Sequence, residues 1–210
     1  MVTHVPAEAL GDERGALLSF VEAQRGAIRR SLIGLTAEQA ASRPSASELS
    51  LGGLLKHVAE TELNWLRMAQ QRPSETSRNE KTWADSFRLV GDETVEGMLG
   101  FWDDVAAQVE EFIRSAPSLD DTFPLPPAPW FPKEGRVSLR WLLLHLVEEH
   151  ARHAGHADVI RESLDGSTAF ELVARADGAK GAESVEGAEG AESVESAESV
   201  ESGEGYADQS

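Results

Sequence analysis

Four segments of about 20 residues repeat their apolar side chains at helical spacing, and this periodicity limits the fold more than any other feature. They span residues 12–34, 51–71, 93–115 and 138–164. In the third segment the apolar positions are Val95, Leu99, Trp102, Val105, Val109 and Phe112. This is the pattern of a helix that buries one face. Alternating β-branched runs are few, so the sequence predicts an all-α four-helix bundle.

Two of the connections are long. Residues 72–92 are mostly polar, and residues 116–137 contain six prolines, which exclude a helix there. Loops of this length usually carry function or disorder. We expect them to frame the mouth of a site, with the aromatic residues of "TWADSF" and "PPAPWF" as candidate walls. Loop aromatics are at least as often packing residues, and that alternative stays open.

The C-terminal segment has a different composition from the bundle. Glutamate occupies every third position from Glu183 to Glu204, and residues 179–210 carry −8 of the net charge of −18. Few large apolar groups are present to offset the entropy of ordering. The sequence predicts an N-terminal extension at 1–11, a bundle at 12–170 and a disordered acidic tail at 171–210. An acidic partner-binding arm is the alternative for the tail.

Composition excludes several classes of function. The bundle segments are acidic and lack a basic stripe, which argues against nucleic acid or anionic lipid as partner. No apolar run reaches the roughly 18–20 residues of a membrane helix, and no signal peptide is recognisable, so we expect a cytoplasmic protein. There is no cysteine, so any metal must be held by nitrogen and oxygen.

The segment HLVEEHARHAGH, residues 145–156, holds four of the six histidines. On a helical wheel of about 100° per residue, one arc collects the apolar side chains that should face the core and a group of polar ones. The members of this arc are Leu142, His145, Leu146, Glu149, His153, His156, Ile160 and Leu164. His150 falls at the margin and is expected to point towards the edge of the bundle.

A carboxylate in a bundle core is costly unless it is paired or bound to a cation. Glu149 and His153 are four residues apart, about 5–6 Å at Cβ, so they can hold one ion. His57, on the core-facing side of 51–71, can supply a third ligand. A lone buried histidine is more often a hydrogen-bonded core residue, and a His/Glu cluster can be a solvated face. Together the three favour a metal site.

Two imidazoles and one carboxylate suit Zn²⁺ best, with Fe²⁺, Ni²⁺ or Mn²⁺ as alternatives. Such a site leaves coordination positions open for water or substrate. His145 and His156 are expected around the site, where they would orient ligands or move protons. Asn64 and Trp65, on the same helix as His57, are candidate substrate-binding residues.

The segments "LGGLLKHVAETELNWL" and "GRVSLRWLLLHLVEEHARHAGHADVIRESLDG" resemble the DinB superfamily, specifically its actinobacterial branch related to mycothiol-dependent enzymes. The resemblance covers roughly residues 10–170. It implies a four-helix bundle with a divalent metal near one end of the core. The family pattern has one histidine on the second helix and a His/Glu-x-x-x-His pair on the last, which falls on His57, Glu149 and His153. Glutamate at 149 is similar to the mycothiol-dependent maleylpyruvate isomerase type.

The leading hypothesis is therefore a metal-dependent transferase that passes a low-molecular-weight thiol, mycothiol, to a small electrophile. Nothing in the sequence identifies the electrophile, and a homodimer is left open. One alternative is a non-catalytic metal-binding or stress-related protein of the same fold. Another is a metal-dependent hydrolase or isomerase that uses a metal-bound water.

Overall fold

The computed structural model describes residues 12–178 except 75, 77, 81, 128 and 130. Within them it contains the four expected long helices: α1 (Glu13–Ser31), α3 (Leu51–Ala69), α4 (Val95–Ser115) and α5 (Leu139–Asp165). The all-α prediction is confirmed. The N-terminal extension 1–11 and residues 179–210 of the acidic tail lie outside the described residues. Residues 169–178 are helical, so the boundary expected after residue 170 falls inside a helical segment.

Each long helix begins at a side chain that caps its free backbone N–H groups. The capping residues are Asp12, Ser50, Thr94 and Ser138, and each accepts a hydrogen bond from the backbone N–H three positions ahead. α5 ends at Gly166, whose φ of 76° is left-handed and favours glycine. The helix boundaries therefore follow from local sequence.

The connections contain short elements that the sequence did not predict. The first holds the helix α2 (Ala37–Ala41), capped by Thr36 and Gln39 in a reciprocal capping box. The second holds a 3₁₀-helix, η1 (Trp83–Phe87). The third forms an antiparallel hairpin of β1 (Thr122–Pro124) and β2 (Arg136–Ser138), with Phe123 opposite Val137.

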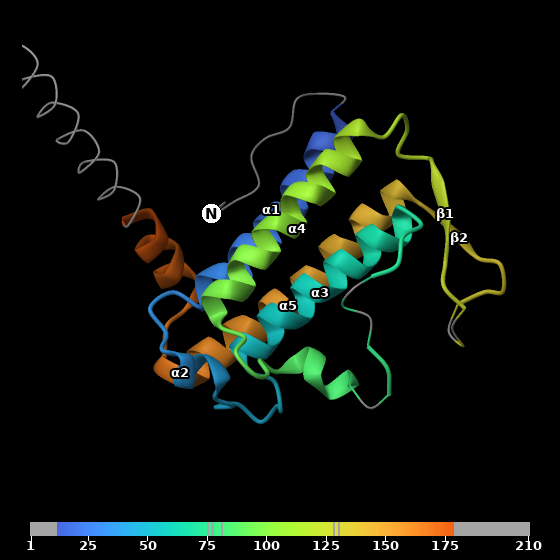
Figure 1. Cartoon of the computed structure of the whole chain (residues 1–210). Coiled ribbons are helices and arrows are strands. Elements are labelled where there is room, and N and C mark those ends of the chain that lie inside the picture. The colour runs from blue at the N-terminus through green and yellow to red at the C-terminus, as the bar shows by residue number, and fades with distance from the viewer. Residues whose placement is uncertain are drawn as a thin grey trace, which may run out of the picture. The chain divides into compact units, whose positions relative to one another are not determined.

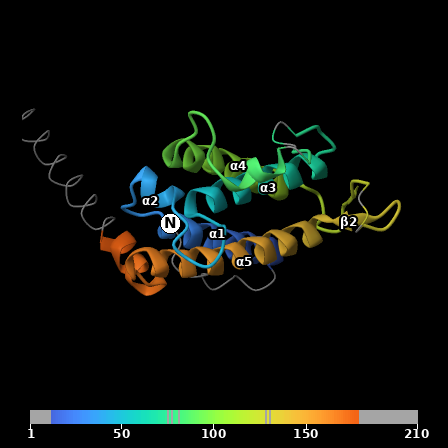
Figure 2. The same ribbon diagram turned by 90° about the horizontal axis from the view of Figure 1, so that it is seen from below.

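The four long helices pack in two layers, α1 beside α5 and α3 beside α4 (Figures 1 and 2). Glu13 and Arg140, both in first turns, form an ion pair, so α1 and α5 begin at the same end. Arg14 donates to the backbone oxygen of Ala116, just after α4, so α1 and α4 are antiparallel. The chain therefore runs in one direction through α1 and α5 and in the other through α3 and α4.

Because α3 and α4 are parallel, the segment that connects them must run back along the length of the bundle. The 19 residues of α3 span about 28 Å. We call the described residues of 74–93 the return segment. It contacts α3 in reverse order, through the pairs Ser74–Asn64, Arg78–Glu60 and Glu93–Lys56. The length of the polar connection is thus explained by topology.

At the centre of the apolar core, each long helix contributes one polar or aromatic residue. We call this group the four-helix junction; its members are Arg25, Glu62, Trp102 and His150. Glu62 accepts hydrogen bonds from Arg25 Nε at 3.2 Å and from Trp102 Nε1 at 2.7 Å. His150 Nε2 lies 3.5 Å from a Glu62 oxygen. Burial lowers the pKa of His150 to about 4, so its ring is neutral at pH 7.

The expectation that His150 points towards the bundle edge is wrong, because its side chain is wholly buried. The buried face of α5 also includes Leu143, Ala154, Ala157 and Arg161. The centre of this buried face lies about 60° further round the helix than the centre of the arc expected from the sequence. Glu149, His145 and His156 therefore lie along the margin of the core rather than in its middle.

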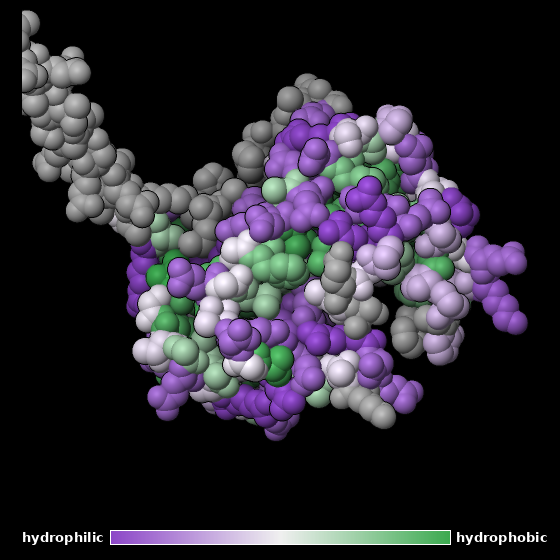
Figure 3. All heavy atoms as spheres, in the orientation of Figure 1, coloured by the Kyte–Doolittle hydropathy of each residue, from purple (hydrophilic) through white to green (hydrophobic). Residues whose placement is uncertain are grey.

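The surface seen from the side of α3 and α4 is mostly hydrophilic, with hydrophobic side chains showing between polar ones (Figure 3). None of the helices in the described part of the chain is both long and apolar enough to cross a membrane.

Candidate metal centre

The structure brings His57, Glu149 and His153 together. His57 comes from α3, and the other two come from consecutive turns of α5. One atom of each residue, a ring nitrogen or a carboxylate oxygen, lies within 4.8 Å of the other two. Among the described residues this is the only such group of three histidine, aspartate or glutamate side chains. It is the trio expected from the sequence.

The spacing of the trio suits one metal ion. Glu149 Oε1 lies 3.2 Å from His57 Nε2 and 3.3 Å from His153 Nε2. Neighbouring ligands of a tetrahedral ion with bonds of about 2.0 Å are about 3.3 Å apart. The three side chains keep between 10 and 17% of their exposure, so solvent reaches the site. The donor set and its separations therefore fit a divalent ion.

The electrostatics of the trio favour an ionised carboxylate. Hydrogen bonds from His153 and His57 hold the pKa of Glu149 well below its usual range, although burial opposes this. The trio thus offers an ionised carboxylate at neutral pH. A carboxylate must be deprotonated to bind a divalent cation, so this charge favours the ion.

The two accompanying histidines lie in different surroundings. His156 Nδ1 lies 3.4 Å from His153 Nδ1, on the side of the His153 ring away from Glu149. His145 stacks on Trp141, with ring centroids 5.1 Å apart, and meets the edge of Trp65 at 4.6 Å. His156 is thus placed to orient a ligand, whereas His145 belongs to an aromatic group.

Trp65 and Asn64 are adjacent in sequence but face different surroundings. Trp65 contacts Trp141, His145 and Phe131 of the hairpin connection. Asn64 lines a pocket of about 210 Å³ together with His57. Asn64 thus shares a pocket with a member of the trio, whereas Trp65 packs among aromatic rings.

Phe87 is a residue of the site that the helical periodicity did not reveal. Its ring stacks on His57 with centroids 4.2 Å apart and an interplanar angle of 18°. A Cβ atom at Gly53 would lie 2.0 Å from the backbone oxygen of Phe87, so glycine allows the return segment to approach α3 this closely. The "TWADSF" motif, expected as a candidate wall, was the signal for this contact.

With this geometry established, the chain can be compared with known proteins. A family model described as mycothiol-S-transferase matches residues 16–166. The chain belongs to the mycothiol S-transferase family. This family is DinB-like, which confirms the resemblance inferred from the sequence. The match includes both helices that carry the trio.

Solved structures support the fold of this mycothiol S-transferase family member. The chain is similar to a conserved protein from Enterococcus faecalis, with a TM-score of 0.54 and 16% sequence identity. The match covers 77% of this chain and all of the other one. At that identity the likeness concerns the fold alone. None of the curated proteins compared with the chain matches it.

Proposed function

We propose that this protein is a metal-dependent transferase that activates the thiol of mycothiol for attack on a small electrophile. The family match supports mycothiol as the co-substrate and group transfer as the reaction. The observation that carries the metal dependence is the convergence of one carboxylate oxygen and two imidazole nitrogens on a point that solvent reaches.

In this proposal the chain provides the metal ligands and the co-substrate provides the sulfur. His57, Glu149 and His153 would hold a divalent ion, Zn²⁺ on the chemistry of the donor set. Such an ion lowers the pKa of a bound thiol, so that the nucleophilic thiolate is available at neutral pH. The chain has no cysteine, so the reacting sulfur comes from the co-substrate.

The surroundings of the trio support its orientation. Phe87 fixes the plane of the His57 ring by stacking on it. His156 Nδ1 lies 3.4 Å from His153 Nδ1. With a metal ion on Nε2 of His153, it would accept a hydrogen bond from the remaining Nδ1–H and so orient the His153 ring. The electrophile is a small molecule whose identity the trio does not specify.

The test of this function uses cobalt. The protein is stripped with a chelator and loaded with Co²⁺, and mycothiol is then added. We expect an intense thiolate-to-cobalt charge-transfer band and a Co²⁺ stoichiometry near one per chain. A mycothiol-consumption screen with small electrophiles then reports the transfer. If Co²⁺ binds but no thiol changes its spectrum, the transferase proposal fails and a metal-dependent hydrolase or a non-catalytic metal protein takes its place.

Neighbouring glutamates provide the matched control. Glu149→Gln removes the charge of a trio member, whereas Glu148→Gln removes the charge of an exposed residue paired with Arg152. We expect Glu149→Gln and His57→Ala to reduce bound metal at least tenfold, as losing one of three chelating groups does. Glu148→Gln should keep the metal. Equal retention of metal in the two glutamine variants would contradict the assignment.

A further inference from the structure

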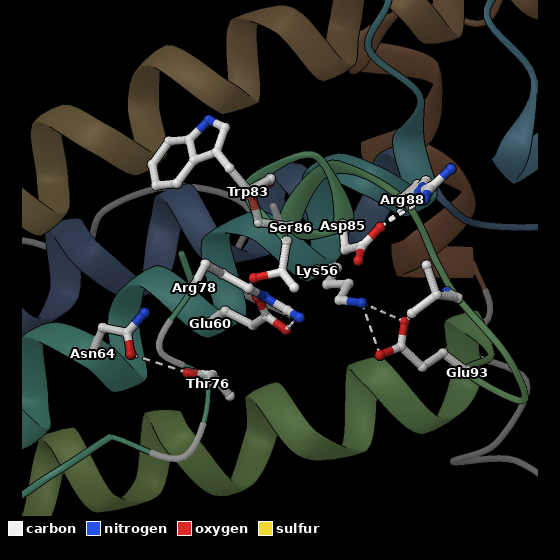
Figure 4. Close-up of polar contacts among 12 residues, drawn as sticks. Lys56, Glu60, Asn64, Thr76, Arg78, Trp83, Asp85, Ser86, Arg88 and Glu93 are labelled. Atoms are coloured by element: carbon white, nitrogen blue, oxygen red, sulfur yellow. Dashed lines mark hydrogen bonds and ion pairs between the residues drawn. The ribbon is translucent and has the colours of Figure 1, made fainter. Parts of the chain in front are cut away.

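A second binding feature lies beside the trio, between α3 and the return segment. It is a pocket of about 210 Å³ that shares His57 with the metal centre. Its lining residues are His57, Glu60, Thr61, Asn64, Arg78, Trp83 and Ser86. Figure 4 shows Glu60 and Asn64 of α3 facing Arg78 and Thr76 of the return segment, with the Trp83 indole at the edge. We call this space the side pocket.

The charges in the side pocket cancel each other. Arg78 binds both carboxylate oxygens of Glu60, with Nε 3.0 Å from one of them. The Glu60 side chain is only 7% exposed, so the pair is largely shielded from water. A charged ligand would have to disrupt this pair or be desolvated without a counter-charge, which is unfavourable. The side pocket therefore suits an uncharged ligand.

The remaining groups suit a ligand rich in hydroxyls. Asn64 Oδ1 accepts hydrogen bonds from Ser74 and Thr76, and this orients its amide nitrogen away from them (Figure 4). The hydroxyl of Thr61 and the guanidinium of Arg78 add further polar groups. These groups provide donors and acceptors at several points around a small volume, as a polyol requires.

Trp83 gives the side pocket a flat apolar surface. Its side chain is 61% exposed, which is unusual for an indole in a protein of this size. Its ring meets Phe87 at 6.3 Å, and Phe87 stacks on His57, so three rings connect the edge of the pocket to the metal centre. An exposed indole beside hydroxyl and amide groups can bind the apolar face of a sugar ring.

The wall that carries Trp83 is anchored along α3. Lys56, wholly buried, pairs with Glu93, whose carboxylate also accepts the backbone N–H of Val90. The hydrogen bonds to Asn64 and the Arg78–Glu60 pair add two more attachments. Because these attachments hold the wall in place, little ordering is needed on binding.

We propose that the side pocket binds the uncharged polyol portion of the thiol co-substrate, with Trp83 stacking on a sugar ring while the thiol extends towards His57. The inference rests on the proposed function and deepens it. It places discrimination between thiols in the return segment rather than at the metal. Mycothiol carries a sugar–inositol group. Glutathione, a charged peptide, has no such group and would enter the side pocket poorly.

The first test compares two thiols that differ in the polyol. KM and kcat are measured with mycothiol and with N-acetylcysteine, which has the same reactive group and no polyol. Trp83→Ala should raise KM for mycothiol about tenfold, with kcat little changed. KM for N-acetylcysteine should stay the same. Trp83→Phe should restore most of the affinity for mycothiol, because it keeps a flat face.

An exposed aromatic residue elsewhere serves as the control. Phe20 of α1 is 47% exposed and lies outside the side pocket. Phe20→Ala should change neither KM. If Trp83→Ala weakens both thiols equally, or neither, the subsite is wrong even though the transferase activity is present.

The second test needs no turnover. The thiol-free, N-acetylated sugar–inositol portion of mycothiol is titrated calorimetrically into chelator-treated protein. Wild type should bind it, and Trp83→Ala should bind at least about tenfold more weakly. No binding by wild type, or equal binding by the variant, overturns the subsite. Binding by wild type that the variant loses, together with no response of Co²⁺ to any thiol, would retain the subsite and reject the transferase.

Discussion

Arg161 shows how one charged residue can be buried at low cost. Its side chain is 2% exposed, and Nη1 donates to the backbone oxygens of Ser31 and Ile33 at 2.8 and 2.9 Å. Ser31 is the last residue of α1, where helix carbonyls lack partners, and Ile33 lies in the turn that follows. Asp165, four residues along α5, balances the charge. A single guanidinium thus closes one helix and joins it to another.

This arrangement predicts an acid-dependent loss of stability. The hydrogen bond from Arg161 lowers the pKa of Asp165 from 3.8 to about 2, although burial opposes this shift. A carboxyl with a lowered pKa stabilises the folded state above its unfolded pKa, and this stabilisation is lost as the pH falls from about 4 to about 2. Asp165→Asn should therefore lower the free energy of unfolding at pH 7 and flatten its decline in that window. Chemical denaturation at several pH values measures both, and an unchanged slope would contradict the assignment.

A single element, the helix α3, carries the proposed metal ligand His57 and also holds the return segment in place. Its side chains at i, i+4 and i+8, which are Lys56, Glu60 and Asn64, hold the return segment, and His57 directly follows the first of them. Gly53 lies on the same helix, where Phe87 approaches most closely. One helix thus supplies a metal ligand and the attachment points of the wall beside it.

Two glycine-to-alanine substitutions distinguish the effect of helix propensity from the effect of the close contact between Gly53 and Phe87. Gly100 lies in α4, where an added Cβ atom would meet nothing within 4 Å, so Gly100→Ala should stabilise the protein by about 0.5–1 kcal/mol. Gly53→Ala offers the same gain in propensity, but its Cβ meets the Phe87 backbone at 2.0 Å. We expect a lower Tm and weaker Co²⁺ binding, because the stacking on His57 is lost. Stabilisation by both substitutions, measured by thermal unfolding, would show that the return segment moves aside freely.

At the scale of the whole bundle, the four-helix junction joins all four long helices at one carboxylate. Glu62 is wholly buried. Burial raises the pKa of Glu62, but the charge of Arg25 and the hydrogen bonds from Arg25 and Trp102 outweigh it, and the pKa lies below its ordinary value. The carboxylate is therefore ionised, and its charge balances a buried guanidinium. Such a pair ties the helices together in one register.

Removing one partner of the buried Arg25–Glu62 ion pair should lower the free energy of unfolding more than removing one hydrogen bond to it. Glu62→Gln leaves the buried Arg25 with only the 3.3 Å contact to the partly exposed Glu22 as a counter-charge, and it should lower the free energy of unfolding by about 3 kcal/mol. Trp102→Phe removes only the 2.7 Å indole hydrogen bond and some volume, and should cost about 1–2 kcal/mol. Urea unfolding ranks the two variants, and a smaller effect for Glu62→Gln would show that the junction contributes little.

Sequence by itself determined the features that depend on neighbouring residues along the chain. The four helices follow from apolar spacing, and their starts follow from Asp12, Ser50, Thr94 and Ser138. The Glu149 and His153 half of the site also follows, because residues four apart on a helix must share a face. His57 was identified because a histidine interrupts a core-facing stripe, and this placement agrees with the structure.

The tertiary structure alone decided how wide a face each helix buries and which loop covers it. A helical wheel does not show how many other helices pack against a given helix. α5 lies against both α1 and α3, so His150 is buried rather than at the edge. The parallel course of α3 and α4 likewise has no local signal, yet it forces the chain back past His57 and brings Phe87 and Trp83 to the site. These contacts join residues far apart in the sequence, and only the packing of the complete bundle selects them.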